Sequence, residues 1–313
     1  MSVLSCLHPE GTLTLRCDYY LIIPVVQAQD RAEEERPEMT TVALLGAGGK
    51  MGVRLSLNLA KTDFTVRHVE VSEAGRARLK EAVGVDCVEQ TAALDGAEVV
   101  VLAVPDTAIG KVAQGIVPTL KPGTMVVILD AAAPYAGHLP EREDITYFVT
   151  HPCHPMIFNN EDTEAARLDR FGGVAHPQGV VNALMQGPEE HYALGDKVAK
   201  AIYAPVRQTY RVTVEQLAYL EPGLSETVCA SLLVVMKQAM DECVKQGISE
   251  ECAKDFLLGH MNILGAVIFG IQEGQFSDAC NKAIEFGIPA LMKDDWKRVF
   301  EQDEIMASIK RIT

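Results

Sequence analysis

From Thr41 onward, short apolar runs alternate with stretches of helical periodicity, and this alternation restricts the fold more than any other feature of the chain. Runs that are apolar throughout, such as Val99 to Val104, are typical of strands buried on both faces of a parallel sheet. The order of the elements therefore predicts an α/β fold built on a doubly wound parallel sheet. The expected strands cover residues 41–45, 65–71, 85–88, 99–104, 125–129 and 145–149, and the expected helices between them cover 51–61, 73–83 and 106–119.

The second half of the chain has a different pattern. Residues 151–188 are rich in His, Pro, Asn and Gly without clear periodicity, which predicts a long irregular segment; a helix over 189–204 and a strand over 206–212 follow. Residues 224–246 are apolar on most of a helical surface, so we expect this helix to be buried within a domain or between subunits. We predict a first domain over 39–212 and an all-helical dimerisation domain over 213–313, in a homodimer.

The first 38 residues precede all regular patterning. Residues 19–26 are apolar and weakly imitate a secretory signal, but Asp18 lies beside the only nearby positive charge. The tandem glutamates before Met39 suggest a purine-rich ribosome-binding sequence in the coding strand. Our hypothesis is that Met39 is the biological first residue and that 1–38 lie outside the native fold.

Charge and cysteine usage limit the class of protein. The formal charge of −15, from 43 acidic and 28 basic residues, repels phosphate backbones and anionic lipids, so neither nucleic acid nor a membrane is an expected partner. No stretch approaches the roughly 20 apolar residues that cross a bilayer. The eight cysteines are scattered without paired spacing, which favours a reducing, cytoplasmic location over a disulfide scaffold.

A glycine-rich turn follows the first expected strand and opens the next helix. Glycines in this position let the backbone approach a pyrophosphate, whose charge meets the N–H groups at the start of the helix. The spacing departs from the strict G-x-G-x-x-G pattern, but the strand–turn–helix context favours a Rossmann-type dinucleotide site. The residues that we assign to this cofactor site are Gly46, Gly48, Gly49, Lys50, Met51 and Gly52.

Two further positions at strand ends complete the predicted cofactor site. Glu70 ends the second strand, where a carboxylate accepts hydrogen bonds from ribose hydroxyls and repels a 2′-phosphate, which favours NAD over NADP. Ser72, Arg76 and Arg78 are counter-evidence, because they could hold a phosphate unless they form a solvated helix face. Val104, Pro105 and Asp106 end the fourth strand, where the cofactor ribose and nicotinamide normally lie.

The candidate reaction centre begins with His151-Pro-Cys-His-Pro155, a stiffened segment after the sixth expected strand. Histidine supplies a proton carrier near neutral pH or a metal-binding nitrogen. We expect His154 to be a base or a ligand and give His151 the less certain role. Cys153 has no Cys-x-x-Cys partner and is interpreted as a small apolar residue.

Two glutamates flank Pro222-Gly223, which we expect to break the chain between two helices. Glu226 is explained equally well by the helix dipole. Glu221 lies in an apolar stretch, where an unpaired charge is costly unless it meets a cation or a metal. We therefore predict Glu221 and Glu226 as catalytic groups with His154, and His154 with Glu221 as ligands of Mg, Mn or Zn. Nearby polar residues with less support are Lys237, His260 and Asn262.

These motifs, together with Val212–Leu217 and Leu220–Thr227, resemble the D-apionate oxidoisomerase group of the 6-phosphogluconate-dehydrogenase-like superfamily over Thr41 to the C-terminus. The resemblance implies a Rossmann domain followed by a helical dimerising domain. It also implies oxidation of the anionic sugar acid D-apionate by NAD, with migration of a hydroxymethyl group to give 3-oxo-isoapionate. The glycine-rich motif that leads to the catalytic lysine of other superfamily members is absent, which counts against Lys237.

Two other classes of function remain open at this level. A simple NAD(P)-dependent hydroxy-acid dehydrogenase, with or without decarboxylation, would use the same fold without a metal and leave the carbon skeleton unchanged. A non-catalytic dinucleotide sensor would bind NADH without reducing anything, and the polar residues at the sheet edge argue against it.

Overall fold

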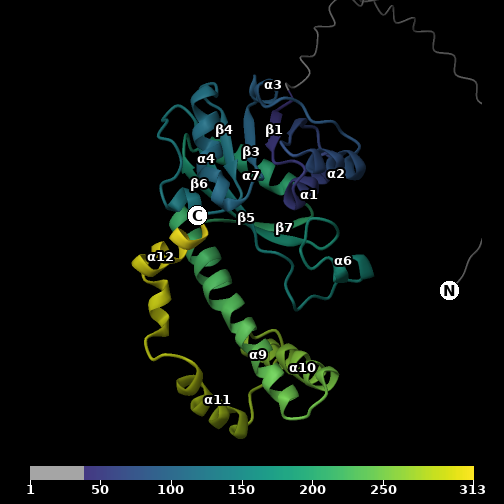
Figure 1. Ribbon diagram of the computed structural model, residues 1–313, viewed down its shortest axis with the longest axis vertical. Helices are drawn as coiled ribbons and strands as arrows, with labels where there is room; N and C mark the ends of the chain where they lie inside the picture. The colour runs from purple at the N-terminus through teal and green to yellow at the C-terminus, as the bar shows by residue number, and fades with distance from the viewer. Residues whose placement is uncertain (1–38) are drawn as a thin grey trace, which may run out of the picture. The chain divides into compact units, whose positions relative to one another are not determined.

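The computed structural model describes residues 39–313, so the hypothesis about residues 1–38 lies outside the described residues. A seven-stranded sheet with the order β2-β1-β3-β4-β5-β6-β7 forms the centre of this part (Figure 1). The strands are β1 (Thr41–Leu45), β2 (Thr65–Val69), β3 (Val99–Leu102), β4 (Met125–Ile128), β5 (Thr146–Pro152), β6 (Gln178–Gln186) and β7 (Val206–Arg211). The α-helices are α1 (Lys50–Leu59), α2 (Glu73–Val83), α3 (Gln90–Leu94), α4 (Asp106–Ile116), α5 (Ala132–Tyr135), α6 (Glu164–Leu168), α7 (His191–Ile202), α8 (Val214–Ala218), α9 (Ser231–Lys245), α10 (Glu250–Ile268), α11 (Asp278–Leu291) and α12 (Gln302–Ile312).

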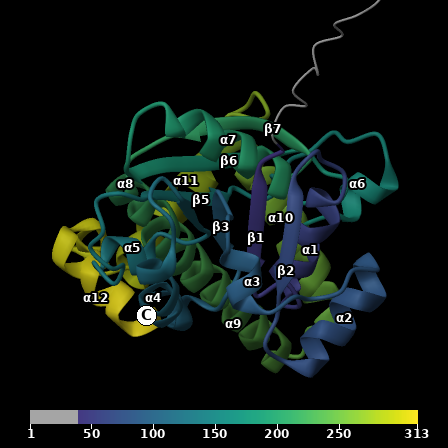
Figure 2. The same cartoon turned by 90° about the horizontal axis from the view of Figure 1, so that it is seen from above.

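The sheet confirms the predicted doubly wound α/β fold. Strands β1 to β5 pair in parallel, β6 runs antiparallel to β5, and β7 is parallel to β6. Helices cover both faces (Figure 2). In β1, Val42 and Leu44 pack in the cluster that contains α1 and α7, whereas Ala43 and Leu45 pack in the cluster with α3 and α4. Because successive side chains alternate between faces, a strand with a core on both sides must be apolar throughout.

Two sequence predictions between residues 85 and 188 are wrong. Residues 85–88 form no strand: they have no regular secondary structure, and Val88 N–H donates one hydrogen bond to the carbonyl of His68 before α3 begins. Strand β6 and helix α6 lie inside the segment that we expected to be irregular. Asn182 interrupts the apolar pattern of β6. It is buried and donates a hydrogen bond to Asp196, so this buried strand contains a polar residue that hides it from a search for apolar runs.

The C-terminal part is helical as predicted, but the expected break at Pro222-Gly223 does not occur. A π-helical segment, Tyr219–Ala230, connects α8 to α9, and Pro222 lies inside it. Proline lacks the N–H group that an α-helix interior requires, so the wider π turn accommodates it where a regular helix would kink. Helix α12 returns to pack against this segment (Figure 1), where Ile305 contacts Gly223 closely.

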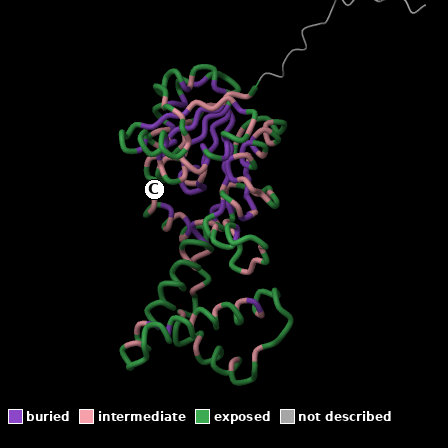
Figure 3. The backbone as a smooth tube through the Cα atoms, turned by 90° about the vertical axis from the view of Figure 1, so that its right-hand side faces the viewer, coloured by how far each residue is buried: buried purple, intermediate pink, exposed green. Residues whose placement is uncertain are grey.

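Many apolar residues of helices α9 to α11 are exposed. The residues of the sheet are mostly buried, in contrast to these helices (Figure 3). In α9 only Met240 is buried, so burial of this helix within the chain is ruled out and burial between subunits stays a prediction. The boundary between domains at 212 and 213 also stays a prediction. Among residues 39–313 no helix is long and apolar enough to cross a membrane.

Candidate active site

The glycine-rich turn after β1 is packed so tightly that side chains are excluded at several positions. Gly46 has a φ of +80°, and a Cβ atom there would lie 2.3 Å from the carbonyl oxygen of Ala103. A Cβ atom on Gly52 would lie 2.1 Å from the carbonyl oxygen of Gly46. The turn therefore leaves its backbone bare at the start of α1, which is the cradle that a pyrophosphate needs.

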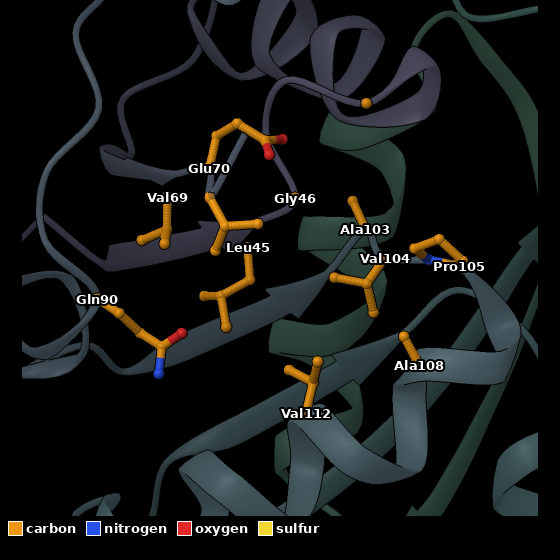
Figure 4. Close-up of a pocket in the computed structure, with 12 residues that line it drawn as sticks. Leu45, Gly46, Val69, Glu70, Gln90, Ala103, Val104, Pro105, Ala108 and Val112 are labelled. Carbon is orange, nitrogen blue, oxygen red and sulfur yellow. The ribbon is translucent and has the colours of Figure 1, made fainter. Parts of the chain in front are cut away.

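A cavity of about 270 Å³ opens beside this turn at the carboxyl ends of β1, β2 and β3 (Figure 4). Its walls include Gly46, Gly49, Glu70, Val104 and Pro105, so five of the predicted cofactor residues lie together. The rest of the lining is mainly apolar (Leu45, Val69, Val71, Ala103, Ala108 and Val112, with Gln90). A cleft between β1 and β3, where the strand order reverses, fits the adenosine half of a dinucleotide.

Other predicted cofactor residues surround the cavity without lining it. Gly48 packs against Gly75 of α2, Lys50 and Met51 form the first turn of α1, and Met51 packs against the core. Asp106 is the first residue of α4. These residues support the cradle or lie at its rim.

Glu70 is buried, and its carboxylate points to the glycine-rich turn (Figure 4). Its oxygens accept hydrogen bonds from the N–H groups of Gly48 at 3.0 Å and Ser72 at 2.8 Å. Arg76 and Arg78 lie on an exposed face of α2 and also donate to the carbonyls of Glu70 and Gly48, at 2.6 and 2.7 Å. In this structure Glu70 shapes the turn, and the predicted contact with ribose would use the lone pairs that remain.

His151 and Glu221 form the centre of the second half of the site. His151 is in β5 rather than in a loop, and its Nε2 lies 2.8 Å from Oε1 of Glu221 in the π-helical segment. Burial by itself lowers the pKa of the His151 imidazole, but the hydrogen bond and charge of Glu221 outweigh it and raise the pKa above its usual value. The predicted partner of Glu221 was His154; the structure gives it His151.

Three more carboxyl groups surround this pair. Burial and the charge of Glu221 raise the pKa of Asp130 to about 8, and a hydrogen bond joins the two side chains. Burial and the same charge raise the pKa of Asp106 and of Glu226. For Glu221, burial raises the pKa, but the hydrogen bond and charge of His151 outweigh it and lower the pKa. Protonated Asp130 thus donates to ionised Glu221.

Asp130 is a site residue that our sequence reasoning missed. It follows the buried strand β4 at the same sheet edge as His151, and its Oδ1 accepts the N–H of Ala132 at 2.6 Å. An aspartate directly after a fully apolar strand was the available signal, because the carboxyl ends of parallel strands meet at one edge.

His154 lies close to His151 but is held by other residues. The two imidazole centroids are 5.9 Å apart, while Nδ1 of His154 lies 2.8 Å from the carbonyl oxygen of Phe171. Because a carbonyl only accepts, Nδ1 carries the proton and Nε2 keeps its lone pair. Burial lowers the pKa of His154, with the charges of His151 and Arg54 acting in the same direction against the Phe171 hydrogen bond.

The remaining polar residues that the sequence singled out do not join this site. Lys237 pairs with Asp241 at 2.5 Å on the exposed side of α9. The ring of His260 stacks on Phe256 at 4.1 Å between centroids, on α10, where Asn262 is also exposed. Among residues 39–313, no cluster of three or more His, Cys, Asp or Glu side chains could hold a metal ion.

Comparisons with known proteins agree with this architecture. Residues 41–134 match the family described as NADP oxidoreductase, coenzyme F420-dependent, and residues 159–313 match the phosphogluconate dehydrogenase (decarboxylating) C-terminal family. A D-apionate oxidoisomerase from Rhizobium rhizogenes is 70% identical over 275 residues, which are 88% of this chain and 100% of that protein. This chain belongs to the D-apionate oxidoisomerase family. A family member from Cupriavidus necator is 65% identical over 272 residues, 87% of this chain and 99% of that protein.

Solved structures extend the comparison of this family member. A protein from Cupriavidus necator, described as a semialdehyde dehydrogenase NAD-binding protein in complex with calcium and NAD, is 64% identical with a TM-score of 0.87. The match covers 88% of this chain and 99% of that one. An NADH-preferring ketol-acid reductoisomerase from an uncultured archaeon, 19% identical with a TM-score of 0.63 over 87% of this chain and 82% of its own, shares the fold. The resemblance predicted from the motifs is confirmed.

Proposed function

We propose that this chain is an NAD-dependent oxidoreductase that acts on a branched sugar acid, D-apionate, and yields 3-oxo-isoapionate. Support comes from relatives named D-apionate oxidoisomerase that are 65% and 70% identical, and from the related NAD complex. The observation that carries the proposal is the meeting of two parts at one sheet edge. The glycine cradle follows β1, and His151, near the end of β5, pairs with Glu221 of the π-helical segment.

The chemistry requires a base, an acceptor of hydride and a polar site for the rearranging oxygens. Bound NAD supplies the hydride acceptor. We assign His154 as the base, because its Nε2 keeps a free lone pair and its lowered pKa keeps the imidazole neutral near pH 7. His154 accepts the proton of the hydroxyl on carbon 2 while the hydride leaves carbon 2 for NAD. The hydroxymethyl group then moves from carbon 3 to carbon 2, and the oxygen on carbon 3 becomes the new carbonyl.

Glu226 is assigned a second acid and base role. It is exposed to solvent, and the desolvation that remains there, together with the charges of Glu221 and Asp106, raises its pKa. A carboxyl group of this kind can pass a proton between the two oxygens during migration. The conservative substitution Glu226→Gln should lower the rate of the rearrangement and change the Kd of NADH much less.

The proposal includes a divalent ion, for which we assign His151 and Glu221 as ligands where the sequence predicted His154 and Glu221. The converging donors are Nε2 of His151 and Oε1 of Glu221, 2.8 Å apart, whereas His154 bonds to Phe171. Two protein donors would leave positions for a hydroxyl and a carboxylate oxygen of the substrate. When bound, such an ion supplies a Lewis acid that polarises the carbonyl.

The test is incubation with NAD and a panel of branched and linear sugar acids, with absorbance followed at the NADH band. D-apionate should be the best substrate, and NMR of the product should show a changed carbon skeleton. A parallel series with EDTA, restored by Mg²⁺, Mn²⁺ or Zn²⁺, tests the ion. NADH formation with an unchanged skeleton would favour a simple hydroxy-acid dehydrogenase and contradict the proposal.

The proposal includes a cytoplasmic homodimer in which helices α9 to α11 of two copies pack together. Exposed apolar residues on these helices include Leu233, Val234, Val235, Phe256, Leu258, Ile284 and Phe286. Exposed apolar side chains gathered on neighbouring helices are typical of interaction surfaces. Val234→Lys should convert a dimer into monomers in light scattering, whereas Leu168→Lys, at an exposed position of α6, should not. A monomeric parent chain would contradict this part.

A further inference from the structure

His154 has an unusual backbone conformation for a residue with a side chain. Its φ is +58°, and among residues 39–313 it is the one non-glycine residue with a positive φ. Such a conformation is strained for a residue with a side chain and persists only where neighbouring groups fix it. The surroundings of His154 should therefore contain the groups that hold it.

Phe171 supplies two of these contacts. Its carbonyl oxygen accepts the Nδ1 hydrogen bond of His154 at 2.8 Å, and its ring lies 4.8 Å from the imidazole, centroid to centroid. One residue thus fixes both the tautomer and the plane of the imidazole.

Arg54, on α1, holds Phe171 from another direction. Its guanidinium carbon lies 4.2 Å from the centroid of the Phe171 ring, and its Nη1 donates to the carbonyl of Gly172 at 2.8 Å. One turn later, Asn58 donates to the carbonyl of Gly173 at 3.0 Å. The cavity left between α1 and this turn is only about 10 Å³, so the contact is nearly close-packed.

Helix α1 begins at the glycine cradle, so the same helix that meets the cofactor supports the turn that holds His154. We propose that Phe171, backed by Arg54, is a positioning residue that fixes the Nδ1–H tautomer of His154 and directs Nε2 at the substrate hydroxyl. The catalytic consequence rests on the proposed function, whereas the tautomer follows from the contacts alone.

Phe171→Ala tests the role of the ring. We expect kcat to fall about 10- to 100-fold, because misplacing a base by an ångström has an effect of this size, while KM for the sugar acid changes less than about threefold. Phe171→Tyr, which keeps the ring, should restore kcat. Leu168→Ala, at a 60% exposed position in the same segment, is the matched control and should leave kcat unchanged.

The spectroscopic test needs no substrate. Long-range ¹⁵N–¹H correlation spectra distinguish the two imidazole tautomers, and loss of one set of signals in His154→Gln assigns the residue. The proposal requires a fixed Nδ1–H tautomer in the parent chain and in Phe171→Tyr. Phe171→Ala keeps the carbonyl but removes the ring that holds the imidazole against it, so the proposal requires a mixture of tautomers there. Because Phe171 is 45% exposed, the alanine variant should fold; thermal unfolding checks this, and Phe171→Leu is the second variant.

Arg54→Gln should lower kcat about 3- to 10-fold and leave the Kd of NADH within about twofold, since a misplaced base loses rate and not cofactor affinity. Weaker binding of NADH with unchanged kcat in Arg54→Gln would assign Arg54 to cofactor binding and overturn its proposed role behind Phe171. Full kcat and an unchanged tautomer in a folded Phe171→Ala would overturn the whole proposal. A parent chain that is inactive on sugar acids but shows the tautomer pattern would contradict only the proposed function.

Discussion

His151 Nε2 lies 2.8 Å from Oε1 of Glu221, so the last part of strand β5 is joined to a π-helical segment far along the chain. This contact gives Glu221, which lies in an apolar stretch of the sequence, a partner for its charge. Its charge meets the imidazole on one side and the protonated Asp130 on the other. A buried carboxylate with two such partners is stable enough to be kept ionised for chemistry.

The first prediction concerns Glu221→Gln. We expect turnover with the best sugar acid to fall about 10²- to 10⁴-fold, because the substitution removes the charge that faces His151 while keeping the shape. Steady-state kinetics check this, and the Kd of NADH should stay within about threefold. Glu215→Gln, an exposed position of α8, is the matched control. Full activity in Glu221→Gln would show that the site is assigned wrongly.

The second prediction separates the hydrogen bond of Asp130 from its charge. Asparagine can accept the N–H of Ala132 through its oxygen and donate to Glu221 through its amide, as protonated Asp130 does. Asp130→Asn should therefore keep turnover within about threefold of the parent at pH 7. Asp130→Leu leaves Glu221 without that donor and should lower turnover at least about tenfold. Equal loss in both variants would mean that ionised Asp130 is required.

The third prediction concerns the glycine cradle. Gly46→Ala places a Cβ atom 2.3 Å from a carbonyl oxygen at a φ of +80°, so we expect NADH affinity to fall at least about tenfold and Tm to drop. Gly115→Ala is the control, because a Cβ atom there meets nothing within 4 Å in α4. The control should raise the free energy of unfolding by up to about 1 kcal/mol. Fluorescence titration and thermal unfolding measure the two effects, and unchanged NADH affinity in Gly46→Ala would contradict the assignment.

The fourth prediction concerns the turn that carries Phe171. The carboxylate of Asp169 accepts the N–H groups of Gly172, Val174, Ala175 and His176 at 2.8–3.1 Å. Burial raises the pKa of Asp169, but these four hydrogen bonds outweigh it and lower the pKa. Asp169→Asn should cost about 1–3 kcal/mol of stability at pH 7 and speed amide exchange over residues 172–176.

The pH dependence of this effect has a definite sign. A carboxyl with a lowered pKa in the folded state contributes stability above its unfolded pKa of about 3.9. That contribution is lost as the pH falls through the folded value. The difference in unfolding free energy between the parent and Asp169→Asn should therefore be constant from pH 7 to about 5 and shrink below about 4. A difference that grows with acidity would contradict the assignment.

Local patterns were enough to predict the α/β core and the cofactor cradle. Strand β1 and helix α2 begin and end at the predicted residues, because burial on both faces and helix capping by Ser72 leave local signals. Strand β6 was missed because Asn182 is satisfied by Asp196, a partner that a linear pattern does not reveal. The π-helical segment was missed because Pro222 and Gly223 normally end a helix, and only the packing of α12 against them favours its continuation.

The sequence by itself determined the α/β class, the helical nature of the C-terminal part, the position of the glycine cradle and the family. It also indicated that Glu221 needs a partner. Only the tertiary structure decided that the partner is His151, that Asp130 joins them, and that His154 is held by Phe171. The physical reason is that periodicity and steric demand act between near neighbours in the chain. The partner of a buried charge or an imidazole is set instead by which strand ends and helices the folded sheet brings together.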